Sequence, residues 1–403
     1  MKYTRDEVLQ YVAEEDVKFI RLAFCDVFGR QKNVAILPTE LPRAFRHGIA
    51  IDASAIAGFG GAVRSDLLLH PDPATLTGLP WRSENGSVVR MFCTVAHPDG
   101  TVLRSDSRAV LQRAVEDAAA AGLRFAFGAE MEFYLFRTDE HGDATREPID
   151  RAGYMDIAPG DRGENIRREI CLTLSQMGFQ PESSHHEEGP GQNEIDFRYA
   201  EPLAAADDAI TFRSVVRTIA ARSGLAADFS PKPLPGEPGS GMHVNLSVRS
   251  DGGADVTDRV IAGILAHIRE MTVFFNTAEE SYARLGSRKA PRYVSWSSEN
   301  RSQLIRIPAA PVDAPRAELR SPDPLCNPYL AFALLIRAGM DGVERALTLP
   351  PAADLNLFSA PPEVTAQFDT LPASLAEAKA LAAASEFVRA ALPEEIISVY
   401  CGK

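Results

Sequence analysis

Two glutamates stand two residues apart in an apolar run, and this pair is the strongest chemical signal in the chain. Residues 127–136 read FGAEMEFYLF, so Glu130 and Glu132 alternate with hydrophobic residues. A β-strand places alternate residues on opposite faces, which puts the two carboxylates on one face about 7 Å apart. Like charges side by side on a strand are unfavourable. A solvated strand face is the plain alternative, but the apolar flank favours a cation shared between the two carboxylates.

Three further segments repeat this pattern of polar groups on one face and hydrophobic residues on the other. Residues 242–248 (MHVNLSV) place His243, Asn245 and Ser247 together, and residues 316–320 place Glu318 between two arginines. A Gly/Pro loop delivers Glu187 and then Glu194 within residues 185–197. Four such strands predict a curved sheet with a polar, functional concave side. The candidate metal ligands are therefore Glu130, Glu132, Glu187, Glu194, His243 and Glu318.

Carboxylate oxygens with one imidazole suit hard cations, so Mg²⁺ or Mn²⁺ is expected rather than a metal held by thiolates. The sequence contains no H-E-x-x-H, no Walker A motif and no G-x-G-x-x-G, which argues against the commonest zinc-hydrolase, P-loop and Rossmann sites. Several arginines lie in or near the acidic segments. Metal ions that neutralise phosphate oxygens, with arginines that stabilise developing charge, predict phosphoryl transfer. These arginines are Arg284, Arg301, Arg306, Arg316 and Arg320.

The bulk composition limits the surroundings in which this chemistry takes place. With 403 residues the chain is long enough for two domains, and its net charge of −13 argues against a nucleic-acid-binding surface. The five scattered cysteines form no C-x-x-C pair, which is typical of a reduced cytoplasmic protein. The sequence has no run of 18 apolar residues and no apolar signal core at its start, so no membrane segment is expected.

The elements that must position the polar residues follow from periodicity and capping signals. The first hundred residues predict a short helix over 4–16, a β-hairpin over 19–36, a long loop over 51–73 and a strand over 88–96. A helix over 107–121 opens the second unit, in which strands and helices alternate. Helices are predicted near 163–177, 205–222, 257–279 and 328–345, and strands near 125–136, 193–199, 242–249 and 316–321.

With these residues in view, the chain resembles the type I glutamine synthetases, and the shorter α-type most closely. The glutamate strand, the turn GQNE at residues 191–194, GSGMH at 239–243 and NRSQLIRIP at 300–308 are highly specific as a set. Matching segments run in order from residue 17 to about residue 345. The resemblance implies an α+β protein with a small β-grasp-like N-terminal domain, residues 1–102. The catalytic domain, residues 103–403, is expected to have a curved antiparallel sheet lining the active site and helices outside.

The resemblance also implies an activity and an assembly. ATP would phosphorylate the γ-carboxylate of glutamate, or of a close analogue, and an amine would displace phosphate, with two or more Mg²⁺ or Mn²⁺ ions per site. The expected assembly is a homo-oligomer, a hexamer or dodecamer of stacked rings, with each site completed by a neighbouring subunit. Its partners would be small molecules, without nucleic acid or membrane.

By position, the matching motifs imply a role for each site residue. Glu132, Glu187 and Glu194 match the ligands of one metal, and Glu130, His243 and Glu318 match those of the second. Gly239, Arg284, Arg320 and Tyr154 match the substrate-binding positions, whereas Ser247, Arg301, Arg306 and Arg316 match ATP and phosphate contacts. The residues expected to act in catalysis are Asp52, Arg301 and Arg320.

The departure from the family pattern that bears most on the acceptor is in the flap segment. The family has a flap glutamate before Ala-Pro that covers the intermediate and deprotonates ammonium, and here a segment one residue shorter places Lys289 there. A lysine repels an ammonium ion and is a poor base unless its pKa is strongly lowered. The favoured expectation is an acceptor amine other than ammonia. The alternatives are an ordinary glutamine synthetase with a re-registered flap, and a catalytically impaired scaffold or regulatory protein.

Overall fold

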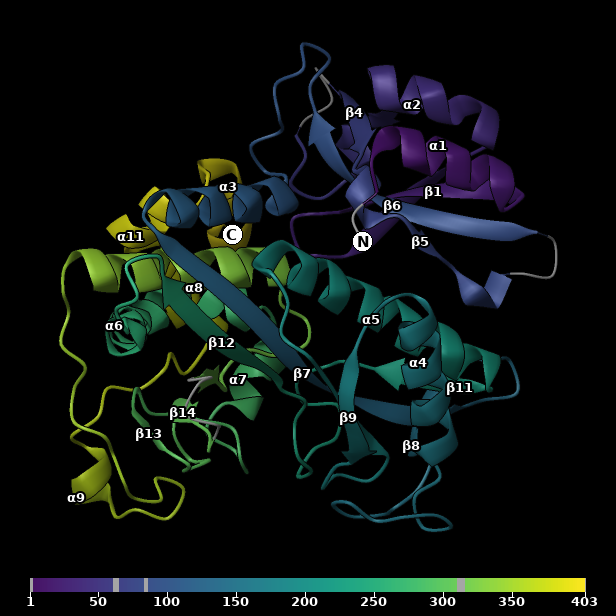
Figure 1. The fold of residues 1–403 in the computed structure, drawn as a ribbon. Coiled ribbons are helices and arrows are strands. Elements are labelled where there is room, and N and C mark those ends of the chain that lie inside the picture. The colour runs from purple at the N-terminus through teal and green to yellow at the C-terminus, as the bar shows by residue number, and fades with distance from the viewer. Residues whose placement is uncertain (1–2, 61–64, 83–85, 310–315, 403) are drawn as a thin grey trace.

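The computed structural model describes residues 3–60, 65–82, 86–309 and 316–402. Two units are visible in Figure 1, a small N-terminal one above and a larger one below. The small unit opens with α1 (Arg5–Glu14), where the side chains of Thr4 and Glu7 form a capping box. Its sheet has the strand order β2-β1-β6-β4-β3, with β5 added on β6. The elements of this unit are β1 (Val17–Cys25), β2 (Gln31–Ile36), α2 (Leu41–His47), β3 (Ile49–Asp52), β4 (Asp66–Pro71), β5 (Thr77–Gly78) and β6 (Ser87–Ala96).

The small sheet confirms most of the predicted N-terminal elements and corrects one. The hairpin expected over 19–36 is the antiparallel pair β1–β2, and β6 runs parallel to β1. The loop expected over 51–73 is wrong for residues 66–71, because β4 lies there and pairs with both β3 and β6. Leu67 and Leu69 are buried in the small core, an alternation that is typical of a half-buried strand.

The large unit is organised around β7 (Leu123–Thr138), the longest strand of the described chain. Its nine-stranded sheet has the order β13-β14-β15-β12-β7-β10-β9, with β8 and β11 also paired to β7. All of its pairs are antiparallel except β13–β14, which is parallel. The other strands of this sheet are β8 (Ala144–Pro148), β9 (Pro181–His186), β10 (Gln192–Phe197), β11 (Leu225–Asp228), β12 (Met242–Ser250), β13 (Trp296–Ser298), β14 (Ile305–Ile307) and β15 (Ala317–Leu319).

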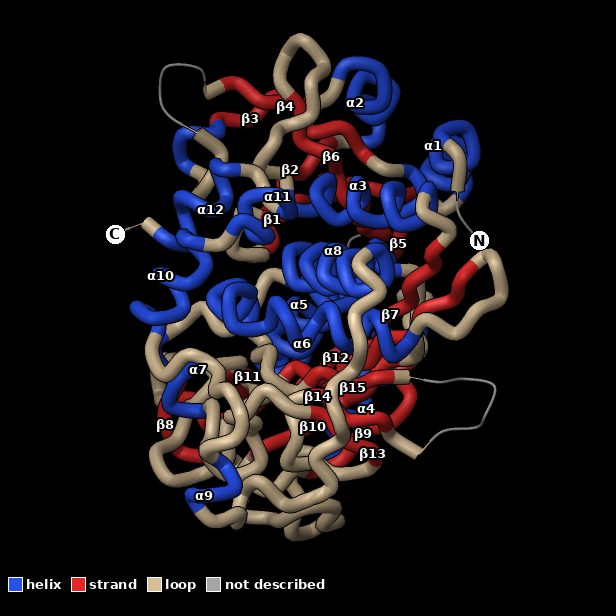
Figure 2. The backbone as a smooth tube through the Cα atoms, turned by 90° about the vertical axis from the view of Figure 1, so that its left-hand side faces the viewer, coloured by secondary structure: helices blue, strands red, loops and turns tan. Residues whose placement is uncertain are grey.

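Helices cover the outer face of this sheet, as Figures 1 and 2 show. On β7, Phe127, Met131 and Phe133 face the helices, and the Phe127 ring stacks on Phe332 of α8 at a centroid distance of 4.5 Å. Burial of this face leaves Glu130 and Glu132 on the other. The helices are α3 (Ser107–Ala120), α4 (Glu164–Gln176), α5 (Pro202–Arg222), α6 (Thr257–Phe275), α7 (Glu279–Arg284), α8 (Pro328–Glu344), α9 (Pro362–Thr365), α10 (Leu375–Ala384), α11 (Glu386–Ala391) and α12 (Glu394–Cys401).

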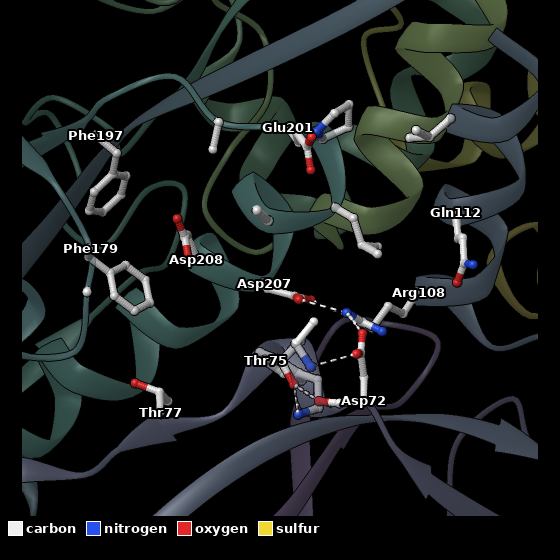
Figure 3. A pocket seen from close by; sticks show the side chains of 18 of the residues that line it. Asp72, Thr75, Thr77, Arg108, Gln112, Phe179, Phe197, Glu201, Asp207 and Asp208 are labelled. Carbon is white, nitrogen blue, oxygen red and sulfur yellow. Dashed lines mark hydrogen bonds and ion pairs between the residues drawn. The ribbon is translucent and has the colours of Figure 1, made fainter. Parts of the chain in front are cut away.

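The two units meet around a buried arginine. Arg108, on α3, donates to Asp207 of α5 at 3.0 Å and to Asp72 of the N-terminal unit at 2.9 Å (Figure 3). The same junction contains a cavity of about 1040 Å³. The domain boundary expected between residues 102 and 103 stays a prediction; Ala96 and Val102 form an isolated bridge just before it. Across the described residues, every helix is too short or too polar to span a bilayer.

Candidate active site

Strand register brings the predicted metal ligands together on the concave face of the large sheet. His243 of β12 lies opposite Glu130 of β7, and Glu194 of β10 lies opposite Glu132 of β7. Because β7 is the shared neighbour of β10 and β12, ligands from three strands converge at one point. We call Glu130, Glu132, Glu187, Glu194, His243 and Glu318 the carboxylate cluster, and all six line one cavity of about 330 Å³.

The two glutamates of β7 have different electrostatic environments. Burial would raise the pKa of Glu130, but contacts from His243 (Nδ1 to Oε2, 3.3 Å) and Asn245 (Nδ2 to Oε1, 2.7 Å) lower it to about 2. Burial and the nearby charge of Glu187 raise the pKa of Glu132, although that carboxylate accepts hydrogen bonds from Gln192 Nε2 (3.1 Å) and the Gly241 N–H (2.8 Å). Glu130 is therefore an anion at neutral pH, and Glu132 gains from a nearby cation.

A second group of ligand atoms gathers around Glu194. His185 lies 3.7 Å from a Glu187 oxygen and 3.9 Å from a Glu194 oxygen, and one atom from each of the three residues fits within 4.8 Å. Burial, followed by the charges of Glu132, Asp196 and Glu187, raises the pKa of Glu194 well above its usual range. A divalent cation would relieve the repulsion between carboxylates that are crowded in this way.

Glu318 has a different set of partners. Its carboxylate is almost fully buried, lies 2.6 Å from Arg306 Nη1 and forms a short ion pair with Arg320. His243 Nδ1 lies 3.7 Å from the same carboxylate. Ligand atoms of Glu130, Glu194 and His243 form a compact group, whereas Glu318 is held by the two arginines. The expected division into three ligands for each metal therefore remains a prediction.

The arginine side of the cavity has unused donors. Among the described residues, the buried Nε atoms of Arg306, Arg316 and Arg320 have no hydrogen-bond partner. Guanidinium groups at the wall of one cavity are suited to bind an anionic ligand. Carboxylates on one wall and arginines on the other fit a metal–phosphate complex between them.

Most other predicted site residues also line this cavity. Tyr154, Gly239, Arg284, Arg301 and Lys289 are among its lining residues. The Arg284 guanidinium is buried, and its recorded hydrogen bonds go to the backbone carbonyls of Arg320 and Ser321. This arrangement holds the end of β15 in place.

Asp52 and Ser247 are not brought to the cavity within one chain. Asp52 ends β3 in the N-terminal unit, which lies near the top of Figure 2, whereas β12 and β15 lie in the lower half of the view. Ser247 lies further along β12, opposite Ala126, and is absent from the described lining residues. Within one chain, therefore, Asp52 is exposed on the N-terminal unit, and Ser247 lies further along β12 than the residues that line the cavity.

Lys289 lies in the cavity wall with its charge paired. Its Nζ is 2.5 Å from Glu188 Oε1 and 5.5 Å from the centroid of the Tyr154 ring. The Tyr154 ring in turn packs edge-on against His185, with 5.3 Å between the ring centroids. Lysine, carboxylate and aromatic ring thus form the mouth of the cavity.

Sequence reasoning missed His185, Glu188 and Gln192 as lining residues. His185 and Glu188 flank Glu187 in the run HHEE, which is a visible signal for a dense polar turn. The pairing of Glu188 with Lys289, about a hundred residues away, has no local signal.

A carboxylate cluster that faces arginines on a curved sheet has the residue types that metal-dependent phosphoryl transfer requires, and comparisons with known proteins show the family. Residues 16–98 match the family model of the glutamine synthetase beta-Grasp domain, and residues 104–402 match that of the glutamine synthetase catalytic domain. Glutamine synthetases of Clostridium saccharobutylicum and Methanosarcina mazei are 43% and 44% identical to this chain. Each alignment covers 99% of this chain. It covers 94% of the Clostridium protein and 93% of the Methanosarcina protein.

Solved structures agree with the sequence matches. A GmaS/ADP complex has a TM-score of 0.87 at 25% identity, with 97% of this chain and 93% of that chain covered. Apo GmaS gives the same TM-score at 26% identity. The chain belongs to the glutamine synthetase family and is an ATP-dependent carbon–nitrogen ligase of that family. The predicted fold class, a β-grasp N-terminal domain with a catalytic sheet and helices, is confirmed. The family uses divalent metals and typically forms oligomers.

Proposed function

We propose that this chain phosphorylates the γ-carboxylate of glutamate with ATP and passes the γ-glutamyl group to a primary amine other than ammonia. The single observation that supports the choice of amine is Lys289, an ammonium group in the wall of the site cavity. A fixed cation at this mouth raises the energy of a second small cation beside it. An amine with an organic substituent offsets that cost by packing and dispersion contacts that ammonium lacks.

The carboxylate cluster would hold the divalent cations. Its oxygen donors and one imidazole suit Mg²⁺ or Mn²⁺, with two or more ions per site. Bound there, the ions would supply Lewis-acid stabilisation of phosphate oxygens. We assign the Glu132, Glu187 and Glu194 carboxylates to one ion, and Glu130, His243 and Glu318 to the other.

The arginines and the glycine-rich turn would bind the two substrates. Arg301, Arg306 and Arg316 would contact the ATP phosphates, in keeping with their place in the cavity wall and with the ADP bound by the GmaS relative. Glutamate would lie against Gly239, Tyr154, Arg284 and Arg320. Carboxylate binding by buried arginine orients the γ-carboxylate toward the phosphoryl donor.

Asp52 requires a neighbour to act in this reaction. Its position at the end of β3 supports a homo-oligomer, hexameric or dodecameric, in which one subunit's N-terminal unit faces the cavity of the next. We place this assembly in the reducing cytoplasm, since its five cysteines are free in the structure. Light scattering on purified protein would give the number of subunits.

The acceptor is tested by incubating the protein with ATP, Mg²⁺, glutamate and a panel of amines while ADP and γ-glutamyl products are measured. We expect an alkylamine to be used at a higher kcat/KM than ammonia, and a Glu132→Gln variant to provide the inactive control. Fast turnover with ammonia alone would show that the protein is an ordinary glutamine synthetase. The names of the relatives that are 43% and 44% identical favour this second function. Metal binding without any ADP release would show a scaffold protein.

A further inference from the structure

A buried glutamine lies between the carboxylate cluster and the turn that would bind glutamate. Gln192 begins β10 and is 1% exposed, so each polar atom of its amide needs a partner within the protein. Its Nε2 donates to Glu132 Oε2 and to the Gly239 carbonyl, at 3.1 Å each, and its Oε1 accepts from the Gly189 N–H at 2.9 Å. One neutral side chain therefore contacts both a candidate metal ligand and a candidate substrate-binding residue.

The partners of this amide fix its orientation. Its nitrogen faces two acceptors, the Glu132 carboxylate and the Gly239 carbonyl, whereas its oxygen faces a backbone donor. With nitrogen and oxygen exchanged, an oxygen would face both acceptors and an NH₂ group would face an N–H, so the reverse orientation is excluded. The donor residue, Gly189, is close-packed as well, because an added Cβ would lie 2.7 Å from Gln192 Oε1.

The hydrogen bonds to Glu132 leave one of its oxygens for a cation. Both recorded bonds, from Gln192 Nε2 and from the Gly241 N–H at 2.8 Å, go to Oε2. Within the part of the chain that the structure describes, Oε1 accepts no recorded hydrogen bond. Donors of this kind fix the direction of a ligating carboxylate, and loss of one typically weakens metal binding about 10- to 100-fold.

The same amide holds the turn at Gly239. The turn is tight, because an added Cβ on Gly239 would lie 2.3 Å from the Pro231 carbonyl oxygen and 2.8 Å from Arg284 Cγ. The Ser240 N–H donates to that Pro231 carbonyl at 3.0 Å. The Gly239 carbonyl accepts one bond from Gln192 and has a second lone pair, which can accept from the ammonium group of an amino acid.

We propose that Gln192 is a positioning residue that couples metal binding at Glu132 to amino-acid binding at Gly239. The inference rests on the proposed function, since both ligands belong to that reaction. A cation on Oε1 holds the Glu132 carboxylate still, and the amide that donates to it then holds the Gly239 carbonyl. The second ligand to bind therefore orders less of the protein. By thermodynamic reciprocity, each ligand tightens the binding of the other by the same factor, the coupling factor.

The test measures binding without ATP, so that no turnover is involved. Titration calorimetry on the full-length protein gives the Kd of glutamate with and without Mn²⁺, and the Kd of Mn²⁺ with and without glutamate. The two ratios must agree, which checks the measurement internally. We expect a coupling factor of about 10 for the unmodified protein.

A Gln192→Met variant has a side chain of similar volume and loses the amide hydrogen bonds to all three partners. We expect its coupling factor to fall below about three, where direct attraction between the cation and the amino-acid carboxylate supplies what is left. Its Mn²⁺ affinity without glutamate should fall about 10-fold. Gln192→Asn keeps an amide but is one methylene too short to reach both partners, so the same loss of coupling is expected in a second, polar variant.

Tyr134→Phe is the matched control. The Tyr134 hydroxyl donates to the Pro238 carbonyl at 2.6 Å and lies 3.4 Å from Gln192 Oε1, so it contacts the same turn without touching Glu132. Its loss should weaken glutamate binding equally with and without Mn²⁺, which leaves the coupling factor unchanged.

An unchanged coupling factor in both Gln192 variants would overturn the role of Gln192 while the proposed function stands. An equal loss of coupling in Tyr134→Phe would also overturn it, because general loosening of the turn would then explain the effect. If the unmodified protein binds no glutamate or no Mn²⁺, the proposed function is wrong and the role of Gln192 falls with it.

Discussion

At the residue scale, Glu194 shows why a nearby cation would stabilise the carboxylate cluster. Its carboxyl is nearly fully buried among Glu132, Asp196 and Glu187, and their charges together with burial raise its pKa well above the usual range. In the metal-free protein, repulsion between these carboxylates destabilises the fold. A bound cation would attract all of them and so would stabilise the folded state.

A Glu194→Gln variant separates these two effects. We expect the metal-free variant to be more stable than the unmodified protein, because glutamine cannot ionise and so avoids the cost of an acid whose charged form is disfavoured by burial and by the neighbouring carboxylates. The stabilisation by Mn²⁺ should fall at the same time. Thermal unfolding with EDTA and with added Mn²⁺ measures both, and Glu182→Gln serves as the control. Equal Mn²⁺ stabilisation of variant and unmodified protein would contradict the assignment of Glu194 as a ligand.

Single residues also show which parts of the site were predictable. Glu130, Glu132 and His243 could be predicted because strand alternation is written in the local sequence. The contact between Glu188 and Lys289 could not, since it depends on two turns far apart in the chain. Asp52 could be predicted from its sequence motif, but within a single chain it does not lie at the cavity.

At the scale of elements, the packing of α6 on α8 depends on two glycines. An added Cβ on Gly263 of α6 would lie 2.0 Å from the carbonyl oxygen of Ala338 and 2.8 Å from the backbone nitrogen of Gly342 on α8. The two helix backbones therefore touch directly behind the catalytic sheet.

A Gly263→Ala variant should be less stable, despite the better helix propensity of alanine. The propensity gain is about 1 kcal/mol. Forcing the helices apart costs about 2–4 kcal/mol, so the net loss is expected to be roughly 1–3 kcal/mol. Urea unfolding of the metal-free protein measures it. Gly252→Ala, where an added Cβ would lie 3.6 Å from Ser250 Oγ, should be close to neutral. Similar stability of the two variants would rule out the tight crossing.

Elements with strong periodicity were predictable, and short polar strands were not. The predicted helices near 163–177, 205–222 and 328–345 match α4, α5 and α8 within a few residues. β9 has the sequence PESSHH, which lacks alternating apolar residues, and it is a strand because β10 pairs with it. β13 and β14 are three residues each and likewise exist through their neighbours in the sheet.

At the scale of the whole molecule, the junction of the two units contains Asp208, a carboxyl group whose ionised form is destabilised by burial. Burial, then the charge of Asp207, raises the pKa of Asp208 to about 7, partly offset by Arg90. Its carboxyl lies at the interdomain cavity in Figure 3. Because the folded state binds this proton more tightly than the unfolded state, the group's contribution to stability is lost as pH rises from about 4 to about 7.

An Asp208→Asn variant should remove this pH dependence. Its stability relative to the unmodified protein is expected to grow as pH rises, reaching roughly 1–3 kcal/mol above pH 7. Urea midpoints at about pH 5.5 and about pH 8.5 measure the trend. Asp251→Asn, an exposed change on the loop after β12, is the control. A constant difference between variant and unmodified protein at the two pH values would contradict the shifted pKa.

The order of the ligands along β7, β10, β12 and β15 has a consequence for biosynthesis. A ribosome makes Glu130 and Glu132 first and Glu318 last of the six, nearly two hundred residues later. Until β15 has emerged and paired with β12, a nascent chain displays clustered acids without the arginines that accompany Glu318. Of the two proposed ion sites, the one that includes Glu318 can therefore be completed only after residue 318 has been made, whereas the three ligands of the other are all present by residue 194.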